Sequence, residues 1–203
     1  QSARHAGRAA SPVRTPCGQI VAAAARAALR GAASLGVVNS GRRPTPEELG
    51  EVLAAAAAVR REHPRLPLSL CASLGELTDA QAEALAAVGF VRYNHNLESS
   101  RRMFPNLVTT HAYDDRLRTL AAARRAGLRL CCGGIFGVGE TWDDRIEMAL
   151  TLRDEVRPDV VPLNFLHPIP GTPLSGAQPL APMEALTIIA VFRLILPHVD
   201  LKI

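Results

Sequence analysis

Short apolar runs alternate with amphipathic helical segments along this chain, and the alternation limits its possible folds more than any other feature. The strand segments are continuous apolar runs such as Leu66–Cys71 and Leu128–Phe136, which is typical of strands that are buried on both faces. Most of the intervening segments carry the apolar period of a helix that covers a sheet. The sequence therefore predicts an α/β fold with a parallel sheet covered by helices.

Capping and termination signals place the boundaries of these segments. Thr45 with Glu48 and Thr78 with Gln81 form two capping boxes, so a helix is predicted to begin at each. Gly127 is a usual helix terminator. The predicted helices cover residues 18–30, 45–61, 78–87, 113–126, 141–155 and 182–196. The predicted strands cover residues 34–38, 66–71, 128–136, 159–166 and 200–203, with another around Tyr93. Residues 1–16 show no period and are predicted to be loop.

Polar residues near the carboxyl ends of four strands decide between two arrangements of the sheet. The strands can form a doubly wound sheet or most of an eight-stranded barrel. A doubly wound sheet usually has a glycine fingerprint after its first strand, and none is present. In a barrel the strand ends meet at one mouth, where active sites lie. The strand-end residues are Cys71, Asn94 to Glu98, Cys131 with Cys132, and Asn164. We therefore predict one (β/α)8 TIM-type barrel domain over residues 1–203. It is expected to be incomplete, with about six βα units, because whole barrels usually need ~250 residues.

The polar stretch Arg92–Glu98 ends a buried strand. Successive strand side chains alternate between faces, so Asn94, Asn96 and Glu98 are expected on one side and His95 on the other. Three hydrogen-bonding groups at this period suit a polar ligand. A polar loop is the alternative, because asparagine is common where strands end.

Composition excludes several classes of function. Of the 23 basic residues 22 are arginines, spread among acids on several helices, and aromatic residues make up only 4%. A nucleic-acid partner is therefore not expected. No apolar run approaches the ~18 residues of a membrane span, and no signal pattern opens the chain, so a cytoplasmic protein is predicted. Its four cysteines are then expected to be thiols or metal ligands rather than disulfides.

Several motifs resemble the biotin synthase family of radical S-adenosylmethionine enzymes, in the family's order and spacing and essentially from end to end. They are Leu70–Gly75, Tyr93–Glu98, Thr109–Thr110 with Tyr113–Arg116, Cys131–Thr141, Pro162–Leu166 and Pro170–Leu174. The resemblance implies insertion of sulfur into dethiobiotin to give biotin, the last step of biotin biosynthesis. It implies S-adenosylmethionine, a 4Fe-4S cluster and an auxiliary iron-sulfur cluster as cofactors. A flavodoxin or ferredoxin as electron donor and a homodimer are also implied.

Five polar residues receive binding roles from this resemblance. Asn96 and Glu98 would hold the ribose hydroxyls of S-adenosylmethionine, and Arg116 would hold its carboxylate. Asn94 and Asn164 would bind the ureido ring of dethiobiotin. A carboxylate and amides supply the donors and acceptors that a diol and a cyclic urea need in a dry pocket.

A glycine-rich segment adds further cofactor contacts. Gly133, Ile135, Gly137 and Glu140 match the superfamily's strand motif that packs against the adenosyl group. The strand period places Cys131 on the same face as Gly133, Ile135 and Gly137, so a cluster ligand and an adenine contact could share the barrel interior. Without the surrounding matches, a strand that ends in a flexible turn is the alternative.

The cysteines match the auxiliary cluster of the family only in part. Cys71 and Cys131 fall on two of its cysteine positions, whereas Gly36 occupies the third and Lys202 occupies that of the arginine ligand. The cluster is therefore expected to be a 2Fe-2S site or a variant of one. Cys132 either replaces a missing ligand or points outward, since adjacent strand residues face opposite ways unless a bulge intervenes.

The chain is expected to be a fragment. Its first residues resemble the segment after the family's Cys-x-x-x-Cys-x-x-Cys loop, so the three 4Fe-4S ligands are expected outside it, and Cys17 is expected to be an ordinary thiol. Alone the fragment is expected not to cleave S-adenosylmethionine.

Two other classes of function stay open. One is a barrel enzyme of different chemistry, although the only lysine that this chain offers for such chemistry is Lys202. The other is a non-catalytic relative that binds a ureido or other polar ligand.

Overall fold

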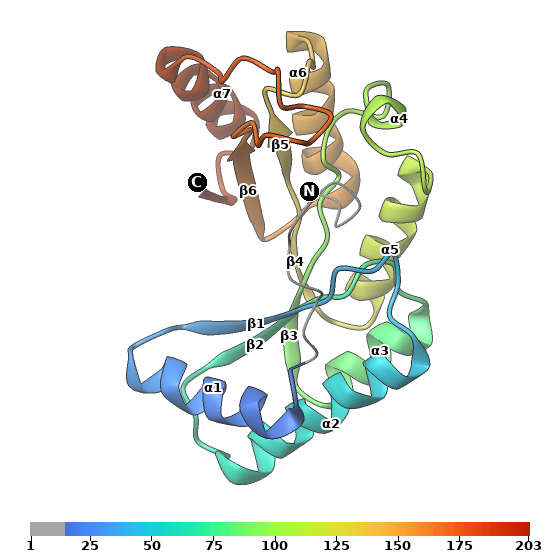
Figure 1. Ribbon diagram of the computed structural model, residues 1–203, viewed down its shortest axis with the longest axis vertical. Helices are drawn as coiled ribbons and strands as arrows, with labels where there is room; N and C mark the ends of the chain where they lie inside the picture. Colours follow the sequence, from blue (N-terminus) through green and yellow to red (C-terminus); the bar gives the residue numbers. More distant parts are fainter. Residues whose placement is uncertain (1–14) are drawn as a thin grey trace. The chain divides into compact units, whose positions relative to one another are not determined.

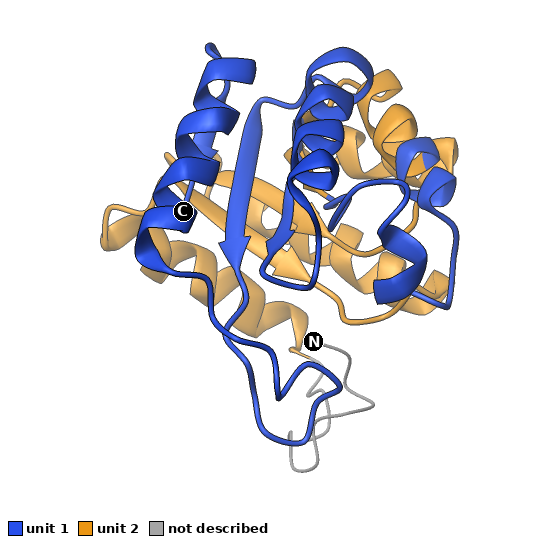
Figure 2. Ribbon diagram, turned by 90° about the horizontal axis from the view of Figure 1, so that it is seen from above, with its two compact units in different colours: residues 1–9, 95–118, 130–203 blue, residues 10–94, 119–129 orange. Residues whose placement is uncertain are grey.

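The computed structural model describes residues 15–203, which form two compact units (Figures 1 and 2). Unit 1 contains residues 95–118 and 130–203, and unit 2 contains residues 15–94 and 119–129. Each unit has its own set of parallel strands. The loop predicted at residues 1–16 lies almost entirely outside the described residues.

Unit 2 consists of three parallel strands and the helices beside them. Its elements are α1 (Cys17–Leu29), β1 (Ser34–Val38), α2 (Pro46–Glu62), β2 (Ser69–Ser73), α3 (Asp79–Ala87), β3 (Phe90–Asn94) and the second half of α5 (Tyr113–Arg125). Gly36 of β1 lies opposite Cys71 of β2, which lies opposite Arg92 of β3. β2 begins later than predicted. Pro67 explains this difference, because proline has no N–H to donate to a strand ladder.

The two predicted capping boxes are confirmed. Thr45 Oγ1 accepts a hydrogen bond from the Glu48 N–H at 3.2 Å, and the Glu48 carboxylate accepts one from the Thr45 N–H at 2.9 Å. The same reciprocal pair joins Thr78 and Gln81, at 3.3 Å and 2.9 Å. Each box satisfies backbone donors that would otherwise lack a partner at the start of a helix, which fixes where α2 and α3 begin.

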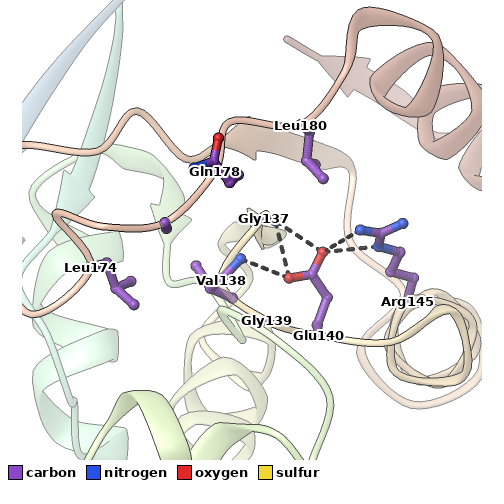
Figure 3. Close-up of a pocket in the computed structure, with 9 residues that line it drawn as sticks. Gly137, Val138, Gly139, Glu140, Arg145, Leu174, Gln178 and Leu180 are labelled. Carbon is purple, nitrogen blue, oxygen red and sulfur yellow. Dashed lines mark hydrogen bonds and ion pairs between the residues drawn. The ribbon is translucent and has the colours of Figure 1, made fainter.

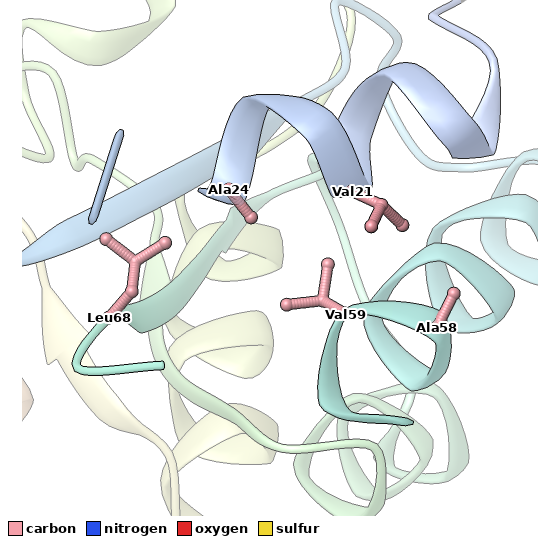
Figure 4. Close-up of a cluster of buried hydrophobic side chains, with 5 residues drawn as sticks. All are labelled: Val21, Ala24, Ala58, Val59 and Leu68. Carbon is pink, nitrogen blue, oxygen red and sulfur yellow. The ribbon is translucent and has the colours of Figure 1, made fainter. Parts of the chain in front are cut away.

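Small apolar side chains hold α1 against α2. The buried cluster between them consists of Val21, Ala24, Ala58, Val59 and Leu68 (Figure 4). Alanine at these positions allows the helix backbones to approach closely. Leu68 precedes β2, so the same cluster attaches the helix pair to the sheet of unit 2.

Unit 1 is arranged around one central strand. Its elements are the first half of α5, α4 (Phe104–Leu107), β4 (Arg129–Cys131), β5 (Gly134–Phe136), α6 (Trp142–Thr151), the π-helical turn η1 (Leu152–Val156), β6 (Val160–Phe165), α7 (Pro182–Ile195) and β7 (Asp200–Lys202). β6 pairs in parallel with β4, β5 and β7 (Figure 1). Within the described residues no helix is both long and apolar enough to cross a membrane.

The single strand predicted over residues 128–136 is wrong, because β4 and β5 are separated at Cys132 and Gly133. The pairings of Cys131 with Val160 and of Gly134 with Leu163 put Gly133 opposite Pro162. The Cys132 N–H still donates to the Val160 carbonyl at 3.0 Å. The next ladder bond would need an N–H on Pro162, which proline lacks, so the ladder is interrupted there.

Candidate functional site

The chain that leaves β3 continues in an extended conformation beside β4. The His95 N–H donates to the Cys131 carbonyl at 3.0 Å, and the Leu97 N–H donates to the Gly133 carbonyl at 2.9 Å. Burial alternates along this segment, with His95 and Leu97 buried and Asn96 and Glu98 half-buried. The alternation predicted from the sequence is therefore confirmed within unit 1.

Three of the predicted cofactor-binding residues meet in unit 1. Arg116 of α5 donates from Nη1 to the Asn96 carbonyl at 2.6 Å, and the same nitrogen lies 3.6 Å from Glu98 Oε1. The Asn96 side-chain oxygen accepts a hydrogen bond from the Gly133 N–H at 3.1 Å. Glu98 has a φ of 71°, a left-handed conformation that is uncommon for residues other than glycine. A cation, a carboxylate and an amide thus share one partly buried cluster.

His95 lies beside this cluster as a neutral imidazole. Burial, with the charges of Arg116 and His111 as further causes, lowers the pKa of His95 to about 3. The ring therefore carries no charge near neutral pH. Arg116 then supplies the positive charge of the cluster.

Close packing explains both adjacent glycines after Cys132. A Cβ added to Gly133 would lie 2.0 Å from the Pro162 carbonyl oxygen, and one added to Gly134 would lie 2.5 Å from the Glu98 carbonyl oxygen. Any side chain at either position would collide with backbone that cannot rotate away. Ile135 follows them, and its side chain is half-buried. Backbone contact within the protein thus requires Gly133, which the sequence assigned to cofactor binding.

Glu140 closes the turn that follows β5. Its carboxylate accepts hydrogen bonds from the Gly137 N–H at 2.9 Å and 3.0 Å and from the Val138 N–H at 2.8 Å (Figure 3). Gly137 and Gly139 both have positive φ, at 87° and 98°, which suits glycine. The Glu140 side chain is 2% exposed and forms an ion pair with Arg145 at 2.8 Å. Its contacts in the structure hold the turn in shape.

The two predicted substrate residues belong to different units. Asn164 in β6 is exposed, and its Nδ2 donates to the Gly134 carbonyl at 3.0 Å, next to the cluster of unit 1. Asn94 is the last residue of β3 in unit 2. A shared role in binding one ring stays a prediction for this pair.

The cysteines differ in burial and in face. Cys131 is half-buried, whereas Cys132 is fully buried, and burial raises the pKa of the Cys132 thiol. Leu130 and Phe136 are also buried and Ile135 is half-buried, so Cys132 shares the covered face and Cys131 the other face. Cys71 is buried in β2 of unit 2, and Cys17 is exposed. Across residues 15–203, no three His, Cys, Asp or Glu side chains form a group that could hold a metal ion.

Family comparisons agree with this geometry. Residues 13–152 match the Radical SAM superfamily. The chain belongs to the radical SAM superfamily. A second match, to the Biotin and Thiamin Synthesis associated domain, covers residues 162–203 of this radical SAM protein. Membership in the superfamily implies S-adenosylmethionine and an iron-sulfur cluster as cofactors, in agreement with the prediction.

Curated relatives of this radical SAM chain are biotin synthases. The biotin synthase of Syntrophotalea carbinolica is 50% identical over 194 residues, which cover 95% of this chain and 58% of the relative. The biotin synthase of Geobacter sulfurreducens is 48% identical over 198 residues, which cover 97% of this chain and 59% of the relative. The chain thus spans less than two thirds of the length of these relatives.

Two solved structures share its fold. Methylornithine synthase aligns with a TM-score of 0.83 at 21% identity, over 97% of this chain and 57% of that one. The FeFe-hydrogenase maturase from Carboxydothermus hydrogenoformans aligns with a TM-score of 0.72 at 20% identity, over 94% of this chain and 46% of that one. At these identities the likeness concerns the fold alone. It confirms the predicted class, an incomplete α/β barrel of the radical SAM type.

Arg145 is a residue near the site that sequence reasoning missed. It lies in α6, its side chain is 5% exposed, and it contacts both Glu140 and Glu184. Its guanidinium carbon also lies 4.7 Å from the centre of the Trp142 ring. An arginine five residues after Glu140 carries no sequence signal of its own, because Glu184 is far along the chain.

Proposed function

We propose that the full-length protein containing this chain is a biotin synthase that inserts sulfur into dethiobiotin. Identity near 50% to curated biotin synthases over almost the whole chain supports this assignment. The observation that carries it is the meeting of Asn96, Glu98 and Arg116 in one cluster of unit 1. A flavodoxin or ferredoxin as electron donor, a homodimer and a cytoplasmic location belong to the same proposal.

The chemistry of this cluster fits S-adenosylmethionine. The Arg116 guanidinium has a planar fork that matches a carboxylate, and its bond to the Asn96 carbonyl fixes its orientation. The Glu98 carboxylate, 29% exposed, can accept hydrogen bonds from a ribose diol. Gly133 and Gly134 keep the backbone beside it free of side chains. Charge and hydrogen-bonding capacity are thus complementary to the carboxylate and to the ribose of the ligand.

The residues of this chain have positioning roles in the reaction. S-adenosylmethionine and the 4Fe-4S cluster, when bound, supply the 5'-deoxyadenosyl radical. Arg116 and Glu98 orient the cofactor, and the turn closed by Glu140 forms a wall beside it. Asn164 presents an amide at the carboxyl end of β6, where a cyclic urea needs donors and acceptors. Neutral His95 adds no charge beside Arg116.

The auxiliary cluster fits the described residues less well. Thiolates are the usual ligands of iron-sulfur clusters. Cys131 lies on the open face of its strand, whereas Cys132 lies on the covered face with its pKa raised by burial, which disfavours a thiolate. Lys202 and Gly36 supply no thiol. We therefore assign a ligand role in unit 1 to Cys131 rather than Cys132.

The test compares two arginines of α5 in the reconstituted full-length protein. Arg116→Ala removes the carboxylate partner and is expected to raise the dissociation constant of S-adenosylmethionine about 10- to 100-fold, as for a lost charge-assisted hydrogen bond. Arg118→Ala is the matched control, because its side chain is 69% exposed and contacts Asp115, a surface pair worth little. Equilibrium binding under anaerobic conditions measures both variants.

Formation of biotin from dethiobiotin by the unmodified full-length protein is the second measurement. Biotin formation together with weakened cofactor binding in Arg116→Ala alone supports the proposal. Equal affinities in Arg116→Ala and Arg118→Ala would remove Arg116 from the site. No biotin from an enzyme that cleaves S-adenosylmethionine would place the protein elsewhere in the superfamily.

A further inference from the structure

Arg145 is a buried residue that connects two elements of unit 1. Its Nε donates to Glu140 Oε1 at 2.9 Å, and its Nη1 donates to Glu184 Oε1 at 2.8 Å. Glu140 closes the turn after β5, and Glu184 lies in the first turn of α7. Figure 3 shows Arg145 beside Glu140, with Leu180 near Gly137. One guanidinium therefore joins this turn to the start of α7.

An open hollow of about 340 Å³ lies between the turn and the segment that leads into α7. Residues 137–140 and Arg145 line one side, and Leu174, Ala177, Gln178 and Leu180 line the other. A Cβ added to Gly137 would lie 3.1 Å from Leu180 Cγ, so the two sides already touch at one end. The width of the remaining part of the hollow depends on where α7 begins relative to the turn. The two ion pairs of Arg145 fix that relation.

We propose that Arg145 is a positioning residue for the adenosyl part of S-adenosylmethionine. The Glu140–Arg145–Glu184 bridge sets the width of the hollow in which that part of the cofactor binds. This role rests on the proposed function, which supplies S-adenosylmethionine as the ligand. Arg145 acts by joining the turn to the start of α7.

The two carboxylates of the bridge differ in what they contribute. Glu140 is 2% exposed and bonds the turn amides, so its loss would disrupt the turn itself. Glu184 is 39% exposed, and an ion pair of this kind adds little to stability. Its contact with Arg145 therefore sets a distance more than it stabilises the fold. A lysine cannot span both carboxylates, because its ammonium is a point charge rather than a fork.

The experiment uses Glu184→Gln and Arg145→Lys in the reconstituted full-length protein. Each breaks the bridge and keeps a positive charge beside Glu140. Titration calorimetry measures the affinity for S-adenosylmethionine, for 5'-deoxyadenosine and for methionine. Both variants are expected to bind the two adenosyl ligands about tenfold more weakly, because one wall of the hollow is misplaced. Their affinity for methionine is expected to stay within about twofold of that of the unmodified protein. The denaturation midpoint of Glu184→Gln is expected to be unchanged.

A double variant and a matched control complete the test. Glu184→Gln combined with Arg145→Lys is expected to bind no more weakly than either single variant, since both changes break the same bridge. Asp143→Asn removes an exposed carboxylate from the first turn of α6 and is expected to bind like the unmodified protein.

Several outcomes overturn the role of Arg145. One is that Glu184→Gln binds the adenosyl ligands with unchanged affinity, and another is that the variants lose as much affinity for methionine as for the adenosyl ligands. The others are that the losses of affinity add up in the double variant, or that Asp143→Asn weakens binding as much as the bridge variants do. An unmodified protein that binds no S-adenosylmethionine at all would overturn the proposed function together with this role.

Discussion

Replacement of Gly133 by alanine tests whether packing or cofactor approach requires glycine beside the site. The added Cβ would lie 2.0 Å from the Pro162 carbonyl oxygen and 2.9 Å from the Pro162 Cδ, whereas ordinary contact begins at 3.4 Å. The oxygen belongs to backbone in the central strand β6, so it cannot rotate away. The two segments must move apart by more than an ångström.

That movement acts on several hydrogen bonds at once. The Gly133 N–H donates to Asn96 Oδ1, and the Gly133 carbonyl accepts from the Leu97 N–H. Overpacking costs about 1–3 kcal/mol, and each hydrogen bond lost contributes about 1 kcal/mol more. The expected loss in free energy of unfolding is therefore about 3–5 kcal/mol, a large share of the ~5–15 kcal/mol of a typical domain.

Denaturant unfolding followed by the fluorescence of Trp142, the single tryptophan of the chain, measures this loss in unit 1. Gly176→Ala is the matched control, because nothing lies within 4 Å of its added Cβ, and its effect is expected to stay within about 0.5 kcal/mol. If Gly133→Ala is as stable as Gly176→Ala, the steric argument is refuted. Weakened cofactor binding in such a stable variant would then assign the glycine to ligand approach.

Three further predictions concern buried polar groups. The pKa of His95 is lowered to about 3 in the folded protein, so between pH 6.5 and 3 only the unfolded state protonates this imidazole. The free energy of unfolding should therefore fall as the pH drops from 6.5 towards 3, by up to ~1.4 kcal/mol per pH unit. Denaturation measured across this range should show that His95→Gln removes the slope. Tyr93→Phe leaves the Gly75 carbonyl without its 2.6 Å donor and should cost about 1–3 kcal/mol in denaturant unfolding, with a smaller loss counting against that bond. Burial raises the pKa of Asp144, but the hydrogen bond from Ser100 and the other partners of the carboxylate outweigh this effect and lower the pKa to about 2. Ser100→Ala should therefore reduce the free energy of unfolding by about 1–3 kcal/mol above pH 4. Acid titrations of unfolding should show this difference shrinking as the pH falls towards 2.

Local signals in the sequence determined the elements of this protein and part of its site. The capping boxes at Thr45 and Thr78 fixed the starts of two helices, since their partners lie three residues away. The alternation from Asn94 to Glu98 followed from strand geometry, which depends only on neighbouring residues. The meeting of Arg116 with Asn96 was expected from the family's motifs, and the structure brings the two together.

Only the tertiary structure decided what depends on residues far apart in the chain. The break between β4 and β5 arises because Pro162 lies opposite Gly133, and no pattern within either segment contains that pairing. The separate faces of Cys131 and Cys132 depend on which side of the strand is covered. The bridge of Arg145 to Glu184 spans 39 residues. Strand register and buried ion pairs form through packing between distant segments, and local propensity carries no information about which distant residues will meet.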